Sequence, residues 1–299
     1  MRGERARATE SNVGSTLDDR PLDFDGLIVD LDGVVWRGDV PIEGAVEAIT
    51  AVRDRGVRVL FMTNEPRHSQ TALAGRLTEI GIPATAADVI TSAAATARAV
   101  GEIQGLATHR ALVVGPPALH REVEMEGFEL VPLEQALTAE VVVIGGHEGF
   151  NYGELRAATL AIRNGARLFA TGRDALFPTP DGPSPGTGAI VAAVETAGGV
   201  SAVVVGKPEP IMFEIAREAL RECERVAVIG DHLIADIGGA KRAGLSAILV
   251  LTGTTSRADL DRAEIKPDVV LESIAALPSA MRASDRRSRS THGAKHRNP

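Results

Sequence analysis

The segment IVDLDGVVW, residues 28–36, ends an apolar run with two aspartates, Asp30 and Asp32, which are separated by one leucine and followed by Gly33. Side chains two residues apart on a β-strand point to the same face, so these two carboxylates are expected to lie close together. Two close carboxylates repel each other, and burial increases the repulsion. The segment therefore predicts a strand end at which another group or ion holds the two acids in place.

Short apolar runs alternate with amphipathic segments along the rest of the chain. The runs are rich in valine and isoleucine, which is typical of strands buried on both faces of a parallel sheet. They cover residues 27–30, 57–64, 111–115, 141–146, 167–172, 202–207, 226–231 and 247–253. Between them lie segments with apolar residues at helical spacing, among them 45–56, 69–81 and 210–222. This alternation predicts an α/β fold with a doubly wound, Rossmann-like parallel sheet.

Polar residues follow four of the apolar runs, at the points where the predicted strands end. They are Asp30 and Asp32, Thr63 and Asn64, Lys207, and Asp231. Ligands of open α/β sheets bind outside the carboxyl ends of the strands, so we expect these residues to converge on one crevice.

The four strand ends are unevenly spaced, since 207 − 64 = 143 residues separate the second from the third. That interval contains three apolar runs of its own and predicts an inserted second α/β domain. We expect a core domain made of residues 21–92 and 200–282, with the inserted domain at 93–199.

Several acids and one lysine at a single crevice suit a divalent metal ion and a phosphoryl group. Mg²⁺ typically binds one or two carboxylates, several waters and a phosphate oxygen of the substrate, and Asp30 and Asp231 are suitable ligands. Lys207 offers a positive donor to a phosphoryl oxygen. Thr63 and nearby backbone N–H groups can bind the remaining oxygens, while Gly33 permits a close approach of the backbone.

Four short motifs resemble those of the haloacid dehalogenase (HAD) superfamily phosphatases, in the same order. They read D-L-D-G-V at 30–34, T-N at 63–64, G-K-P at 206–208 and G-D-x-x-x-x-D at 230–236. The long insertion resembles the C2-type cap domain of the NagD-like subfamily, subfamily IIA. The resemblance extends from about Phe24 to Asp268.

This resemblance implies a Mg²⁺-dependent phosphatase that hydrolyses small organic phosphate monoesters through an aspartyl-phosphate. Asp30 would be the nucleophile, Asp32 the general acid and base, and Lys207 a stabiliser of the transferring group. The metal would be held by Asp30, the backbone carbonyl of Asp32 and Asp231, with Asp236 orienting the ligands or a metal-bound water. Substrate and phosphate would contact Gly33, Thr63, Asn64, Asp174, Gly186, Thr187 and Gly188. Family members also suggest a homodimer formed through the cap.

The chain departs from the family pattern at several positions that bear on specificity. Glu65 introduces an anion beside the second motif, His147 and Gly172 replace usual cap residues, and Ile234-Ala235 precede Asp236. The substrate therefore stays open among glycerol 3-phosphate, phosphoglycolate, a sugar phosphate and a nucleotide. Trp36 is expected to pack near the entrance of the site.

Other activities remain as alternatives at this stage. The same intermediate would serve a phosphotransferase that uses a sugar as acceptor. A catalytically weak regulatory binding protein on the same fold is a second alternative. A metal-dependent glycosyltransferase would account for the two aspartates but leaves the G-K-P and G-D-x-x-x-x-D segments unexplained.

Composition narrows the class of protein further. The net charge of −8 among 299 residues argues against a nucleic-acid partner, and no apolar run approaches the roughly 20 residues of a membrane span. The single cysteine, Cys223, permits no internal disulfide, and the first residues lack the apolar core of a secretory signal, so we expect a cytoplasmic protein. Residues 1–20 are expected to be flexible and 283–299 to form a disordered basic tail.

Overall fold

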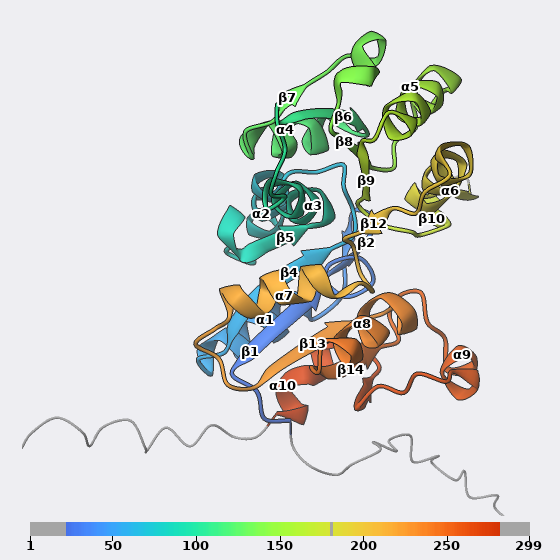
Figure 1. The fold of residues 1–299 in the computed structure, drawn as a ribbon. Coiled ribbons are helices and arrows are strands. Elements are labelled where there is room, and N and C mark those ends of the chain that lie inside the picture. The colour runs from blue at the N-terminus through green and yellow to red at the C-terminus, as the bar shows by residue number, and fades with distance from the viewer. Residues whose placement is uncertain (1–21, 180–181, 282–299) are drawn as a thin grey trace, which may run out of the picture.

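Two parallel sheets form the frame of the computed structural model, which describes residues 22–179 and 182–281 (Figure 1). The predicted flexible segment 1–20 and the predicted basic tail 283–299 lie outside the described residues. The first sheet has six parallel strands in the order β15-β14-β13-β1-β4-β5. These strands are β1 (Gly26–Asp30), β4 (Arg58–Thr63), β5 (Val89–Thr91), β13 (Val226–Gly230), β14 (Ser246–Val250) and β15 (Val269–Leu271).

Both faces of the first sheet are buried, as the continuous apolar runs predict. In β4, Phe61 packs in an apolar cluster with Ile49 and Leu77, whereas Leu60 and Met62 belong to a cluster on the opposite face. Each fully buried side chain of this size contributes about 1.5–3 kcal/mol to folding. The helices and turns of this part are α1 (Ala45–Asp54), α2 (Gln70–Glu79), η1 (Ala86–Asp88), α7 (Pro210–Ala219), η3 (Leu233–Gly238, a π-helix), α8 (Gly239–Arg242), α9 (Arg257–Arg262), η4 (Ile274–Ala276) and α10 (Leu277–Ala280).

The second sheet has five parallel strands in the order β12-β9-β8-β6-β7. They are β6 (Arg110–Val114), β7 (Glu129–Leu130), β8 (Val141–Ile144), β9 (Arg167–Ala170) and β12 (Val203–Val204). The accompanying helices are α3 (Ser92–Gly101), α4 (Pro117–Met125), η2 (Leu133–Thr138), α5 (Tyr152–Arg163) and α6 (Thr187–Gly198). This sheet, with α4 and α5, lies at the opposite end of the molecule from β14 and α10 (Figure 1).

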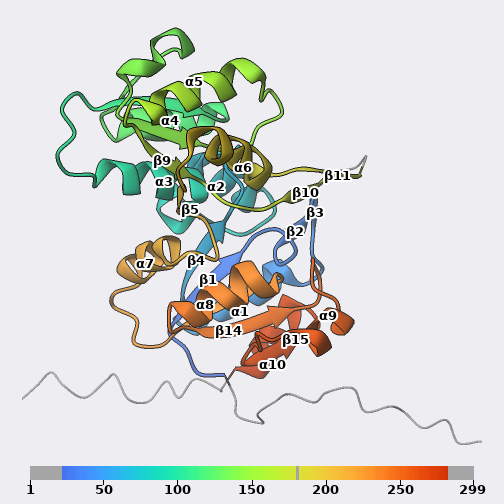
Figure 2. The ribbon, with the colours of Figure 1, turned by 45° about the vertical axis from the view of Figure 1, so that its right-hand side comes forward.

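Two small antiparallel pairs complete the fold. Strands β10 (Leu176–Thr179) and β11 (Gly182–Pro185) form one hairpin, and β2 (Trp36–Arg37) and β3 (Val40–Pro41) form the other. Figure 2 shows β10 and β11 extending away from α6. Neither hairpin was predicted, because their strands have at most four residues.

One strand belongs to a different sheet from the one that the sequence suggested. The run 202–207 was assigned to the core, but only Val203 and Val204 form a strand, and they pair with Phe169 and Ala170 of β9 in the second sheet. The chain can pass close to β9 because residue 206 is glycine, where a Cβ atom would lie 2.2 Å from the carbonyl oxygen of Thr171. Lys207 therefore follows an edge strand of the second sheet. The domain boundaries themselves stay a prediction.

Helices long and apolar enough to cross a lipid bilayer are absent from residues 22–179 and 182–281.

Candidate active site

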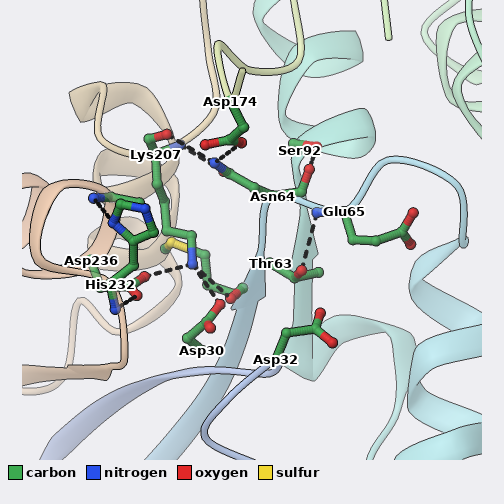
Figure 3. Close-up of polar contacts among 12 residues, drawn as sticks. Asp30, Asp32, Thr63, Asn64, Glu65, Ser92, Asp174, Lys207, His232 and Asp236 are labelled. Carbon is green, nitrogen blue, oxygen red and sulfur yellow. Dashed lines mark hydrogen bonds and ion pairs between the residues drawn. The ribbon is translucent and has the colours of Figure 1, made fainter. Parts of the chain in front are cut away.

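Lys207 lies at the centre of a buried acidic cluster at the carboxyl end of the first sheet (Figure 3). Its Nζ atom donates to Asp30 Oδ1 at 2.6 Å and to Asp236 Oδ1 at 2.7 Å. Asp30 is the last residue of β1, and Asp236 lies in η3, directly after β13. All three side chains are buried. Three segments far apart in the sequence thus meet around one ammonium group.

Asp231 completes a group of three carboxylates. Oxygen atoms of Asp30, Asp231 and Asp236 all lie within 4.8 Å of one another. The backbone N–H of Thr254 donates to Asp231 Oδ2 and fixes that carboxylate. With Lys207 included, the formal charge of this group is −3 + 1 = −2. A buried charge of this size calls for a compensating cation.

The protonation of the cluster follows from burial and mutual repulsion. Burial raises the pKa of Asp30, and the neighbouring carboxylates of Asp236 and Asp231 raise it further, against the opposing effect of Lys207. Burial and Asp236 likewise raise the pKa of Asp231. Burial disfavours the charged form of Lys207, but Asp236 and Asp30 outweigh it, so its pKa is raised and the ammonium stays charged. A divalent cation would shift the balance towards ionised carboxylates.

Asp32 lies apart from this cluster, contrary to the expectation that strand alternation pairs it with Asp30. Strand β1 ends at Asp30, so Asp32 belongs to the following turn, where it forms an isolated bridge with Trp36. Figure 3 shows its carboxylate pointing away from Lys207. The side chain is open to solvent, yet desolvation by the surrounding protein raises its pKa, and Glu65 raises it further. A raised pKa suits a carboxylic acid that donates a proton.

Asn64 follows β4, and its side chain forms two hydrogen bonds with the backbone of Lys207. Its Oδ1 accepts from the N–H of Lys207 at 2.8 Å, and its Nδ2 donates to the carbonyl of Lys207 at 2.9 Å and to Asp174 Oδ2 at 3.1 Å. Ser92 Oγ in turn donates to the carbonyl of Asn64 at 2.7 Å. Phosphate binding by Asn64 stays a prediction, whereas these contacts favour a positioning role, which the sequence did not indicate.

The unusual anion Glu65 is neutralised within its own turn. Its carboxylate accepts from the backbone N–H and side chain of both Arg67 and His68. Burial opposes ionisation of Glu65, but these hydrogen bonds outweigh it and lower its pKa. The Arg67 guanidinium also lies 5.2 Å from the centre of the Phe177 ring in β10. Thr63, at the end of β4, accepts from the N–H of Glu65 at 3.1 Å.

The predicted cap residues meet at the start of α6. The N–H of Gly188 donates to the carbonyl of Asp174 at 2.9 Å, and Thr187 Oγ1 accepts from the N–H of Gly146 at 3.0 Å. A Cβ atom at Gly186 would lie 2.2 Å from the carbonyl oxygen of Asp174, so only glycine allows this approach. Gly186 and Gly188 therefore hold the segment that carries Asp174, whereas Thr187 contacts Gly146. The contact of these three residues with substrate stays a prediction.

Comparison with known proteins identifies hydrolases and phosphatases as relatives of this chain. Residues 27–129 match the family model of haloacid dehalogenase-like hydrolases, and residues 204–277 match the HAD-hydrolase-like model. The chain is 32% identical over 252 residues to the 5'-nucleotidase YutF of Bacillus subtilis, which covers 84% of this chain and 96% of that protein.

Two solved structures are similar to this protein over most of their length. The glycerol phosphate phosphatase of Mycobacterium tuberculosis in complex with magnesium has a TM-score of 0.78 and 38% identity, covering 85% of this chain and 76% of that one. NagD from Escherichia coli has a TM-score of 0.76 and 30% identity, covering 85% and 98%.

The α/β fold and these relatives together show that the protein is an enzyme of the phosphoric monoester hydrolase class. More narrowly, the chain belongs to the haloacid dehalogenase-like hydrolases, and its structural neighbours are NagD-like phosphatases of subfamily IIA.

Proposed function

We propose that this enzyme is a Mg²⁺-dependent phosphatase of small organic phosphate monoesters that works through an aspartyl-phosphate on Asp30. The observation that carries the proposal is the buried group of three carboxylates around Lys207, with its formal charge of −3 + 1 = −2. One divalent cation balances that charge. Lys207 remains available as a positive donor to the transferring group.

The donor set fits magnesium. Mg²⁺ is a hard cation that prefers oxygen ligands, and the cluster offers only carboxylate oxygens, from Asp30, Asp231 and Asp236. The backbone carbonyl of Asp32 is proposed as a further ligand. When bound, the cation would neutralise charge on the phosphoryl oxygens. The similar glycerol phosphate phosphatase from Mycobacterium tuberculosis was solved with magnesium, which supports this assignment.

The two aspartates divide the chemistry between them. In the first step a carboxylate oxygen of Asp30 bonds to phosphorus while the P–O ester bond breaks, and the proton of Asp32 passes to the leaving oxygen. In the second step Asp32 accepts a proton from water as that water's oxygen bonds to phosphorus. The bond between Asp30 and phosphorus then breaks, and inorganic phosphate leaves. Lys207 stabilises the negative charge of the transferring group in both steps.

The leaving group is proposed to be small and hydroxylated. The similar proteins are named a 5'-nucleotidase, a glycerol phosphate phosphatase and NagD, so their names do not agree on one substrate. Glycerol 3-phosphate, phosphoglycolate, sugar phosphates and nucleoside monophosphates form the panel to test. A homodimer formed through the cap remains part of the proposal.

Hydrolysis of p-nitrophenyl phosphate tests the reaction class. We expect activity with Mg²⁺, loss of activity with EDTA, and recovery when Mg²⁺ is restored. The D30N variant should keep its fold by circular dichroism, lose turnover and form no acid-stable, hydroxylamine-sensitive phosphoenzyme. D261N, which changes an exposed aspartate, serves as the matched control and should retain activity. Undiminished hydrolysis by D30N would refute the mechanism.

Product analysis separates hydrolysis from transfer. If an added sugar or polyol captures the phosphoryl group in preference to water, the enzyme is a phosphotransferase. We expect inorganic phosphate as the product at all acceptor concentrations.

A further inference from the structure

Trp36, the only tryptophan in the chain, contacts Asp32 directly. Its indole Nε1–H donates to Asp32 Oδ1 at 3.1 Å. The backbone around this contact is also fixed, because the carbonyl of Trp36 accepts from the N–H of Gly33 at 2.7 Å, and the N–H of Trp36 donates to the carbonyl of Leu31 at 3.2 Å. The side chain and the main chain of Trp36 thus both hold the turn that carries Asp32.

The indole ring is itself held in one orientation. Trp36 is 2% exposed and packs in the apolar cluster that contains Ile49. The guanidinium of Arg76, from α2, lies 4.1 Å from the centre of the ring, which is the geometry of a cation–π contact. Arg76 also donates to the carbonyl of Gly38 and lies 3.5 Å from Asp39. The ring cannot turn without losing these contacts, so its N–H direction is fixed before substrate binds.

This arrangement distinguishes the two oxygens of Asp32. Oδ1 accepts the indole hydrogen bond, so the transferable proton of the acid is best carried by Oδ2. A carboxylic acid on an exposed turn would otherwise rotate freely about its last torsion angle. Fixing that torsion lowers the entropy that must be lost to reach the reactive geometry.

We propose that Trp36 is a positioning residue that orients Asp32 for proton transfer to the leaving group, with Arg76 supporting the indole ring. This role rests on the proposed function, in which Asp32 is the general acid. It adds a second role to the packing that the sequence predicted for Trp36.

The dependence on the leaving group tests the proposal. Alkyl phosphates expel a strongly basic alkoxide and need a well-placed acid, whereas p-nitrophenolate leaves without one. In W36F, which removes the N–H but keeps an aromatic ring, we expect kcat/KM for glycerol 3-phosphate to fall about tenfold or more. We expect kcat/KM for p-nitrophenyl phosphate to fall less than about threefold, since its leaving group needs little protonation. I49V removes one methyl group from the same apolar cluster and should leave the ratio of the two substrates unchanged.

Equal losses for both substrates in W36F would show that Trp36 has a structural role only, and would overturn this inference while leaving the phosphatase assignment intact. Absence of phosphatase activity in the unaltered enzyme would overturn the proposed function and this inference together.

A second measurement does not depend on the folding of W36F. Because the chain has one tryptophan, the indole ¹H–¹⁵N signal in an NMR spectrum is unambiguous. In D32A we expect this signal to move upfield and its exchange with solvent to accelerate by about fivefold, because a hydrogen bond worth about 1 kcal/mol is lost. An unchanged indole signal in D32A would contradict the contact and, with it, the proposal.

Discussion

Gly33 has a backbone conformation that favours glycine, and it also lies against the acidic cluster. Its φ of +80° favours glycine, and a Cβ atom there would lie 2.6 Å from Asp231 Oδ2. Gly56 has nearly the same φ, +84°, but a Cβ atom there would meet nothing within 4 Å. Alanine variants at these two positions therefore distinguish the effect of the left-handed backbone conformation from the effect of displacing Asp231.

We predict that G33A weakens activation by Mg²⁺ about 10- to 100-fold, because the added methyl group pushes against the Asp231 carboxylate. G56A should leave activation unchanged. Both variants should lose about 1–2 kcal/mol of stability from the left-handed backbone conformation. Mg²⁺ titration of phosphatase activity and thermal unfolding check the pair. Equal Mg²⁺ dependence in the two variants would mean that Gly33 matters only for its φ.

The sequence predicted the charged residues of the site, but it did not predict the hydrogen bonds that position them. Asp30, Lys207 and Asp231 were predicted because they follow apolar runs, and Asp236 because the fourth motif resembles that of the HAD family. The structure brings these four residues together. The hydrogen bond from Trp36 to Asp32 was not foreseen, since it depends on the turn after β1 and not on strand alternation.

The link between β12 and α7 carries Lys207 and depends on Asn64, at the end of β4. The Asn64 side-chain amide fixes the Lys207 backbone through two hydrogen bonds, donating to its carbonyl and accepting from its N–H. We predict that N64A lowers kcat by about 10- to 100-fold, because a displacement of the ammonium by about 1 Å has effects of this size. N164A, which loses a hydrogen bond from Nδ2 to the carbonyl of Leu137 at the end of α5, is the matched control.

Steady-state kinetics and unfolding in urea distinguish the two asparagine variants. Both should lose stability by about 1 kcal/mol per hydrogen bond, but only N64A should lose turnover. A fall in kcat of similar size in N164A would show that general loosening of the fold, and not the position of Lys207, limits the rate.

Glu140, just before β8, holds the segment that leads into β6, the neighbour of β8 in the second sheet. Its carboxylate accepts from the backbone N–H groups of Ala107 at 2.6 Å and Thr108 at 2.7 Å, and from Thr108 Oγ1 at 2.8 Å. These hydrogen bonds lower the pKa of Glu140 from 4.5 to about 2. Because the folded-state pKa is depressed, the stabilisation is complete above about 4.5 and is lost as the pH falls through about 2.

We predict that E140Q lowers the Tm at pH 7, and that its difference from the unaltered protein narrows as the pH falls from 4.5 towards 2. E134Q changes an exposed glutamate of η2 and should give no such difference. Calorimetry across this pH range checks both variants. A constant difference at every pH would show that the carboxylate charge has no part in the effect.

Element length explains which parts of the fold the sequence predicted. The runs at 27–30, 57–64, 226–231 and 247–253 became β1, β4, β13 and β14 with small changes at their ends. Strands β5 and β15 have three residues each and were missed, because so short a segment carries little periodic signal. Strand β12 was expected in the core sheet but pairs with β9 of the second sheet. The apolar run 202–207 predicts a strand but does not indicate which strand it pairs with.

The two sheets of the molecule meet at the proposed site, where residues from both contact one another. Asp174 follows β9 of the second sheet, and its Oδ2 accepts from Asn64 Nδ2, at the end of β4 of the first sheet. Lys207 follows β12 of the second sheet and reaches Asp30 of the first. The positions of Lys207, the proposed catalytic lysine, and of Asp174, the predicted specificity residue, therefore both depend on how the second sheet docks on the first.

We predict that D174A changes substrate preference more than it changes stability. The side chain is exposed and accepts a hydrogen bond from Asn64, so its removal should alter the free energy of unfolding by no more than about 1 kcal/mol. Loss of the contact with Asn64 frees the segment between β9 and α6, and KM for the preferred phosphate ester should rise about tenfold, as expected when about 1.4 kcal/mol of binding free energy is lost. D174N keeps the shape of the side chain and tests the contribution of its charge. Kinetics over the panel of phosphate esters check the prediction, and a uniform loss of kcat without any change in relative KM values would show that Asp174 acts on the catalytic step and not on substrate selection.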